Sequence, residues 1–268
     1  MVKHSQKREK STKNKPRIAI YDFTDCEGCE VKLLSIKKKL LDLEDRFDIV
    51  NWRLGQERFE GGPYDITIIE GTPVTEDEIK LLLELRETSK TIVALGACAS
   101  IAGIPGIMNK SERKKWYEKI YGSGYKPKGL DALPLSSYVK VDHMIHGCPI
   151  DGDELIRTLE DLLASKTPKY RGYSVCFDCK KAGNKCRILE EKICFGPITQ
   201  GGCKAICISG GSPCYGCFGL RKDANISSLV RRLKQFASDD EIIKHAEMFF
   251  NQIPEYKEKI KEALDKKL

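Results

Sequence analysis

Cysteine is the residue type with the clearest chemistry in this sequence, which has 12 cysteines among 268 residues. Eight of them fall between Cys176 and Cys217, so they are not spread evenly. No apolar run is long enough to span a membrane, and the charged N-terminus lacks the apolar segment of a secretory signal. We therefore expect a cytoplasmic protein without a membrane span, in which reducing conditions favour metal or redox chemistry over disulfides.

The first four cysteines lie beside the elements of an alternating strand and helix pattern. Short apolar runs predict strands at 18–23, 48–54, 65–70 and 91–95, and helical spacing predicts helices at 31–43, 75–86 and 151–166. This order is typical of an α/β fold with a parallel sheet and helices on both faces. Ligands collect at the carboxyl ends of such strands, so four thiols should meet there: Cys26, Cys29, Cys98 and Cys148.

The other eight cysteines follow the pattern C-x2-C-x6-C-x7-C-x8-C-x3-C-x6-C-x2-C, and they are Cys176, Cys179, Cys186, Cys194, Cys203, Cys207, Cys214 and Cys217. The spacing allows two structural zinc sites or two cubane iron–sulfur clusters, and it does not decide how the eight thiols are divided. Pro213 and the glycine pair at 210–211 favour iron–sulfur slightly. Twelve thiols also divide by four without remainder, so every cysteine can be a ligand of one of three [4Fe-4S] clusters.

Charge and composition divide the chain into segments. Residues 1–17 carry seven basic side chains and one acidic one, so most of the net charge of +7 lies there and nucleic-acid binding by the body is not expected. We expect a basic disordered tail at 1–16, an α/β domain at 17–168, a small metal-organised domain at 169–225 with few apolar runs, and a C-terminal helical segment at 226–268. The last residues, 254–268, are mostly charged and predict a surface helix.

Five motifs in order resemble the small subunit of a [NiFe]-hydrogenase over residues 17–220. They are CEGCE (26–30), GACAS (96–100), HGCPID (146–151), CFGPITQGGC (194–203) and SPCYGC (212–217). The resemblance implies a flavodoxin-like, doubly wound parallel sheet, then a small iron–sulfur-organised domain and C-terminal helices. It also implies that a separate large subunit carries the nickel–iron centre.

The resemblance further implies how the thiols are divided among three [4Fe-4S] clusters. The proximal cluster would be held by Cys26, Cys29, Cys98 and Cys148, the distal one by Cys176, Cys179, Cys186 and Cys194, and the medial one by Cys203, Cys207, Cys214 and Cys217. Two positions depart from many periplasmic members, which have histidine in place of Cys176 and proline in place of Cys207. These departures resemble the cytoplasmic branch, which contains sulfhydrogenases and hydrogenases linked to heterodisulfide reductase.

The function implied by the resemblance is electron relay between the large subunit and a further iron–sulfur or flavin redox subunit, with no catalytic residue in this chain. One alternative is an iron–sulfur subunit of another respiratory-type oxidoreductase, although such subunits have adjacent cysteines near the first strand and lack the second cysteine block. The other alternative is a zinc-ribbon binding protein. Nucleotide or flavin binding by this chain is not expected, because neither glycine-rich phosphate motif is present.

Some polar and aromatic residues near the cysteines have simpler interpretations. Glu27 and Glu30 are interpreted as charges at the N-terminus of a helix rather than as proton carriers. His143 and His146 are expected to serve hydrogen bonding or packing, because four thiols already complete the nearby site. Trp52 is expected to serve packing or an interface.

Overall fold

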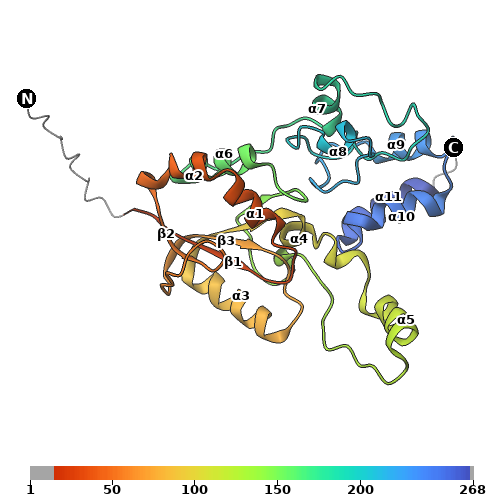
Figure 1. Ribbon diagram of the computed structural model, residues 1–268. Coiled ribbons are helices and arrows are strands. Elements are labelled where there is room, and N and C mark those ends of the chain that lie inside the picture. The colour runs from red at the N-terminus through yellow and green to blue at the C-terminus, as the bar shows by residue number, and fades with distance from the viewer. Residues whose placement is uncertain (1–14, 266–268) are drawn as a thin grey trace, which may run out of the picture.

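A parallel sheet organises the first half of the molecule in the computed structural model, which describes residues 15–265 (Figure 1). Its five strands have the spatial order β2-β1-β3-β4-β5, and they are β1 (Arg17–Asp22), β2 (Asp48–Trp52), β3 (Tyr64–Glu70), β4 (Ser89–Leu95) and β5 (His143–Ile145). All pairings are parallel. This is the flavodoxin-like order, so the predicted fold class is confirmed. Four strands match the sequence prediction, whereas β5 was missed because three residues are too few to show a period.

Helices cover both faces of the sheet. On one face lie α1 (Gly28–Ser35), α2 (Lys37–Leu41) and α6 (Gly152–Leu163), and on the other lie α3 (Glu76–Thr88) and α4 (Gly96–Ile101). Successive residues of a strand point to opposite faces. In β1, Ile18 and Ile20 accordingly pack with Leu155 of α6, while Ala19 packs with Leu82 of α3.

The helix predicted at 31–43 is interrupted. Helix α1 ends at Ser35 and α2 begins at Lys37, and Ile36 between them has the non-helical angles φ −103° and ψ 18°. Ile36 lies against the start of α6, where a Cβ on Gly152 would come within 2.7 Å of its Cγ2 atom. The break therefore follows from a tertiary contact that local spacing does not encode.

The second half forms a lobe beside the sheet that contains α7 (Val175–Lys181), α8 (Ile206–Ser209), α9 (Ile226–Leu233), α10 (Asp239–Phe250) and α11 (Pro254–Asp265). Phe195 and Phe250 are at its apolar core, which also includes Ala97 and Ile101 of α4. The lobe is therefore packed by an apolar core as well as by its cysteine loops. The predicted segments 169–225 and 226–268 share this core in space.

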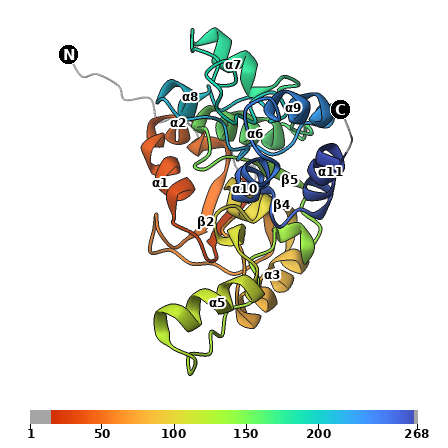
Figure 2. The same ribbon diagram turned by 90° about the vertical axis from the view of Figure 1, so that its right-hand side faces the viewer.

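Two further features concern the chain ends and a projecting helix. Helix α11 exists as predicted, but its charged exterior is matched by a buried face of Ile260, Ala263 and Leu264. Helix α5 (Lys110–Tyr121), which sequence reasoning missed, projects from the body (Figure 2).

The predicted tail at 1–16 lies, apart from its last two residues, outside the described residues. Within residues 15–265 no helix is both long and apolar enough to cross a bilayer.

Neighbouring leucines on α3 provide a test of this packing. Leu82 is 0% exposed against the sheet, whereas Leu83 is 46% exposed. We predict that Leu82→Ala lowers the free energy of unfolding by about 2–5 kcal/mol, because it leaves a cavity, and that Leu83→Ala lowers it by less than about 1 kcal/mol. Urea denaturation followed by circular dichroism measures both, and equal effects would contradict the packing.

Candidate metal centres

Four cysteines converge at the carboxyl end of the sheet, as the sequence predicted. Cys26 follows β1, Cys29 lies in the first turn of α1, Cys98 lies in the first turn of α4, and Cys148 lies between β5 and α6. Burial, and then the nearby Cys148 and Cys26, raise the pKa of Cys98 to about 12. Cys98 in turn contributes to the raised pKa of Cys29, after burial and the charge of Glu70. We call these four residues the proximal group.

A glycine and a backbone hydrogen bond bring the proximal loops together. Gly96 begins α4 with a φ of +83°, and a Cβ there would come within 2.5 Å of the Cys29 sulfur. The N–H of Ala97 donates to the carbonyl of Gly147 at 2.7 Å. The turn that carries Cys98 is therefore tied to the turn that carries Cys148, and at position 96 a side chain would displace a thiol.

Glu70 supports the proximal group and was missed by sequence reasoning. It ends β3, between the strands that carry the cysteines, and it is buried. Its carboxylate accepts the backbone N–H groups of Cys29 at 2.9 Å and Glu30 at 2.7 Å. A carboxylate at a helix N-terminus is favourable because it binds unpaired amides. The sequence did contain a signal for this role, because Glu70 is an acidic residue at the end of a strand predicted to be buried.

Glu30 is a helix-terminal acid with surroundings that the sequence did not suggest. It is fully buried, and the indole N–H of Trp52 donates to its Oε2 atom at 2.7 Å. Its Oε1 atom has no hydrogen-bond partner, and burial raises the pKa of this carboxyl to about 7. The interpretation as a helix-terminal charge is confirmed for the position of Glu30, in the first turn of α1, but it did not foresee that Glu30 is buried. It fits Glu27, which is partly exposed and pairs with Arg53 at 3.0 Å.

A second group of thiols lies on α7 and the loops after it. Cys176 and Cys179 are one helical turn apart, and Cys186 and Cys194 approach from the following chain. Burial, and then Cys194, Cys179 and Cys186, raise the pKa of Cys176 to about 11. A Cβ on Gly196 would lie 3.4 Å from the Cys176 sulfur and 3.6 Å from the Cys194 sulfur. We call these four residues the distal group.

The remaining thiols line a cavity of about 450 Å³ between the two lobes. Cys203, Cys207, Cys214 and Cys217 all border it, and so does Cys148 of the proximal group. The backbone N–H of Cys148 donates to the Cys217 sulfur. The four residues, which we call the medial group, therefore lie directly beside the proximal group.

The chemistry that these residues offer is coordination of metal by thiolates. All twelve cysteines are free of disulfides, and burial raises the pKa of Cys203 to about 11 and that of Cys217 further. Buried thiols become ligands by losing protons as a cation binds, so metal would offset the repulsion among them. Four thiols in each group and a backbone amide directed at sulfur fit a four-iron cluster, and the medial thiols also border a cavity. Among residues 15–265, no three His, Cys, Asp or Glu side chains converge closely enough for a single metal ion.

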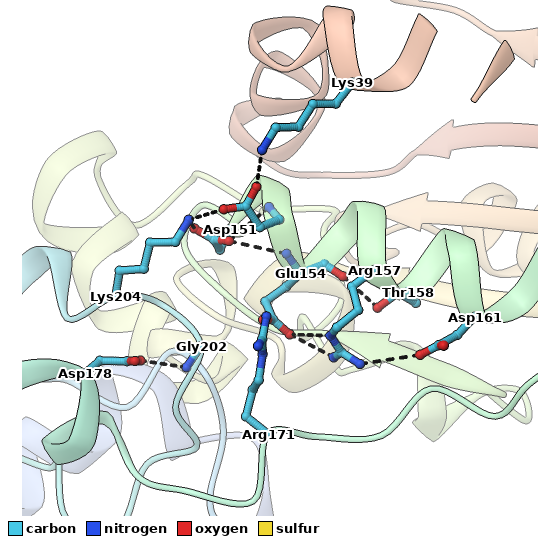
Figure 3. Close-up of polar contacts among 11 residues, drawn as sticks. Lys39, Asp151, Glu154, Arg157, Thr158, Asp161, Arg171, Asp178, Gly202 and Lys204 are labelled. Carbon is cyan, nitrogen blue, oxygen red and sulfur yellow. Dashed lines mark hydrogen bonds and ion pairs between the residues drawn. The ribbon is translucent and has the colours of Figure 1, made fainter. Parts of the chain in front are cut away.

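Polar contacts at the start of α6 join the lobes (Figure 3). Lys204, next to Cys203, binds the carboxylates of Asp151 at 2.9 Å and Asp153 at 2.5 Å, and Lys39 of α2 also pairs with Asp153. Asp151 caps α6 by accepting the Asp153 N–H at 3.0 Å. The loop that carries Cys203 is therefore held to the helix that follows Cys148.

Glu154 is the buried member of this network (Figure 3). Its carboxylate accepts from Arg157 at 2.8 Å on its own helix and from Arg171 on the chain that enters the second lobe. Gly202 packs on it so closely that a Cβ there would lie 3.3 Å from the Glu154 carboxyl carbon. The Gly202 N–H donates to Asp178 of α7 at 2.8 Å. One chain of contacts thus links the loops of all three groups.

His146 lies beside the proximal group without joining it. It is buried, its Nδ1 atom pairs with the Ser100 hydroxyl at 2.7 Å, and its ring stacks on Tyr170 with centroids 5.7 Å apart. Hydrogen bonding and packing were expected for this residue and are confirmed. His143 lies half-buried on β5.

Comparisons with known proteins agree with this arrangement. The family model described as NADH ubiquinone oxidoreductase, 20 Kd subunit, matches residues 26–162. The Sulfhydrogenase 2 subunit delta of Pyrococcus furiosus is 34% identical over 235 residues, covering 87% of this chain and 98% of that protein. A subunit of the vhu F420-non-reducing hydrogenase from Methanococcus voltae is 28% identical, covering 77% and 83%.

Solved structures add a further relative. A chain of the NAD+-reducing [NiFe]-hydrogenase in the H2-reduced state matches with a TM-score of 0.50 and 26% identity, covering 58% of this chain and 95% of that chain. The Pyrococcus alignment is so long that it necessarily includes the segment from Cys176 to Cys217. The likeness therefore extends beyond residues 26–162 into the cysteine-rich lobe.

The Glu154 contacts lead to a prediction about how the lobes are joined. We predict that Glu154→Gln lowers the free energy of unfolding by about 1–3 kcal/mol, because two guanidinium groups lose a buried carboxylate. The exchange of backbone amide hydrogens with solvent should also become faster at residues 171–174 and 201–204. Glu160→Gln, an exposed position on the same helix, is the matched control and should change neither. Unchanged exchange in Glu154→Gln would contradict a joining role.

Proposed function

We propose that this chain relays electrons through three [4Fe-4S] clusters. It belongs to the family described as NADH ubiquinone oxidoreductase, 20 Kd subunit, and within that family it is the small subunit of a hydrogenase. The observation that supports the proposal is the convergence of cysteines from distant parts of the chain, four at the carboxyl end of the sheet and eight on and after α7 and around the cavity beside it. The proximal group lies at the sheet, the medial group borders the cavity beside it, and the distal group lies on and after α7.

The proposal assigns one cluster to each group, with all twelve cysteines as ligands. When bound, the clusters supply single-electron storage and transfer. The residues of this chain position and tune them. Glu70 fixes the first turn of α1, and the amide of Cys214 donates to the Cys194 sulfur at 3.3 Å. The hydrogen bond from the backbone N–H of Cys148 to the Cys217 sulfur is a direct contact between the proximal and medial groups.

The proposal includes partners and a location. A large subunit with the nickel–iron centre would lie against the proximal group and cleave H2, so this chain contains no catalytic residue of its own. A further iron–sulfur or flavin subunit would take electrons from the distal group. Twelve free thiols suit a reducing compartment, which supports a cytoplasmic location.

One prediction separates the proximal and distal groups. In the complex with its large subunit, Cys98→Ala should abolish H2-dependent reduction of acceptors, because every electron crosses the proximal group. Cys179→Ala should remove the exit and leave hydrogen–deuterium exchange at the nickel–iron centre largely intact, since exchange needs no net electron output. Gas exchange measured by mass spectrometry checks this, and its complete loss in Cys179→Ala would indicate that Cys179 serves assembly.

A second prediction concerns the fourth medial thiol. The wild-type chain, prepared without air, should show three four-iron clusters and no three-iron signal. Cys207→Pro should convert the medial cluster to a three-iron form, because three thiolates remain, and proline is tolerated in the first turn of a helix such as α8. Electron paramagnetic resonance of the oxidised protein measures this. A stoichiometric three-iron signal in the wild type would refute the assignment of Cys207.

A further inference from the structure

The surface around the distal group is basic. We call α7 together with residues 182–192 the distal face. Its charged side chains include five basic residues, which are Lys180, Lys181, Lys185, Arg187 and Lys192. The acidic residues in the same stretch are Asp178, Glu190 and Glu191, and Asp178 is buried beneath the face, where it accepts from Gly202. The solvent-facing part of this segment therefore carries an excess of positive charge.

These positive charges lie at the thiols themselves. Lys180 directly follows Cys179, while Lys185 and Arg187 stand on either side of Cys186. Lys180 and Lys185 are both exposed. A positive potential therefore faces solvent where an electron would leave the distal group.

The charges also cluster with one another. Arg187 donates to the Glu190 carboxylate at 2.6 Å. The pairing with Arg187, and then the charges of Lys192 and Lys185, lower the pKa of the Glu190 carboxyl. Three basic side chains thus surround one acid, so Glu190 offsets part of the positive charge without cancelling it.

Two large apolar side chains are exposed on the same face. Phe177 is 55% exposed and Leu189 is 74% exposed. Exposed apolar side chains combined with charged ones are a usual composition of a protein interface. Figures 1 and 2 both place α7 at the end of the molecule opposite α3, so a partner on this face would leave the sheet side free.

We propose that the distal face is the docking surface for the redox partner that takes electrons from the distal group, and that the partner is a small iron–sulfur electron carrier whose surface around its own cluster is acidic. This inference rests on the proposed function, which supplies the electrons. Each H2 oxidised at the partner subunit gives two protons and two electrons, so two carrier molecules are each reduced by one electron. Opposite charges raise the rate of encounter and orient the carrier over the distal group.

The test uses the purified hydrogenase complex and two probe acceptors, an acidic plant-type [2Fe-2S] ferredoxin and a basic c-type cytochrome. The double variant Lys185→Glu with Lys192→Glu reverses charge on the distal face. Lys80→Glu with Lys115→Glu, on α3 and α5, makes the same change in net charge on exposed residues at the other end of the molecule. The second-order rate of H2-dependent reduction is measured at low and high ionic strength.

At low ionic strength the distal-face variant should reduce ferredoxin at least about ten-fold more slowly than the wild type does. It should reduce cytochrome faster, because the electrostatic force between the face and each probe changes sign. The difference should largely vanish near about 1 M salt, where charges are screened within about 3 Å. The control variant should resemble the wild type. Equal ferredoxin rates in the wild type and both variants would overturn the docking proposal.

The exchange of H2 with deuterium at the nickel–iron centre separates this inference from the proposed function. Exchange needs no acceptor, so it should be unchanged in both double variants. Normal exchange together with unaltered ferredoxin rates would reject the basic docking surface and leave the relay standing. A wild-type complex without exchange and without iron–sulfur absorption would reject the relay itself.

Discussion

Bringing four thiols together, with some of them out of water, is the constraint on which the rest of this molecule depends. Burial and neighbouring sulfur raise the pKa of thiols such as Cys98 and Cys176, so without a cation each group opposes its own ionisation. Bound iron would offset that penalty, because iron–thiolate bonds form as the thiol protons leave. The surrounding features follow from the same need. Gly96 leaves room for sulfur, Glu70 holds the turn of α1, and amides such as that of Cys214 point at thiolate positions.

The spacing between groups is as important as the groups, and it depends on the joint between two lobes. Glu154 and Lys204 connect the helix after Cys148 to the loop that carries Cys203. Gly202 extends the connection to Asp178, which stands between two thiols of α7. An electron relay requires fixed distances between its centres. A network that touches the loops of all three groups therefore suits the proposed function, and its buried member Glu154 also contributes to stability.

The sequence predicted the features that repeat locally and missed those made by distant contacts. Apolar runs located four strands, and the rule that ligands collect at strand ends located the proximal group. The break at Ile36 was missed because it depends on Gly152, more than a hundred residues away. The burial of Glu30 was missed because it comes with a contact to Trp52, 22 residues away along the chain. The division of the last eight thiols came from the family resemblance, since their spacing allows many partitions.

The most direct test of the relay is Mössbauer spectroscopy of the iron-57-enriched complex, recorded first under argon and then under H2. The account predicts that the iron of this chain is present in four-iron clusters, three for each chain, and that its spectrum changes to that of reduced clusters when H2 is admitted. Zinc in place of iron, or iron that remains oxidised under H2 while the partner subunit catalyses hydrogen–deuterium exchange, would contradict it.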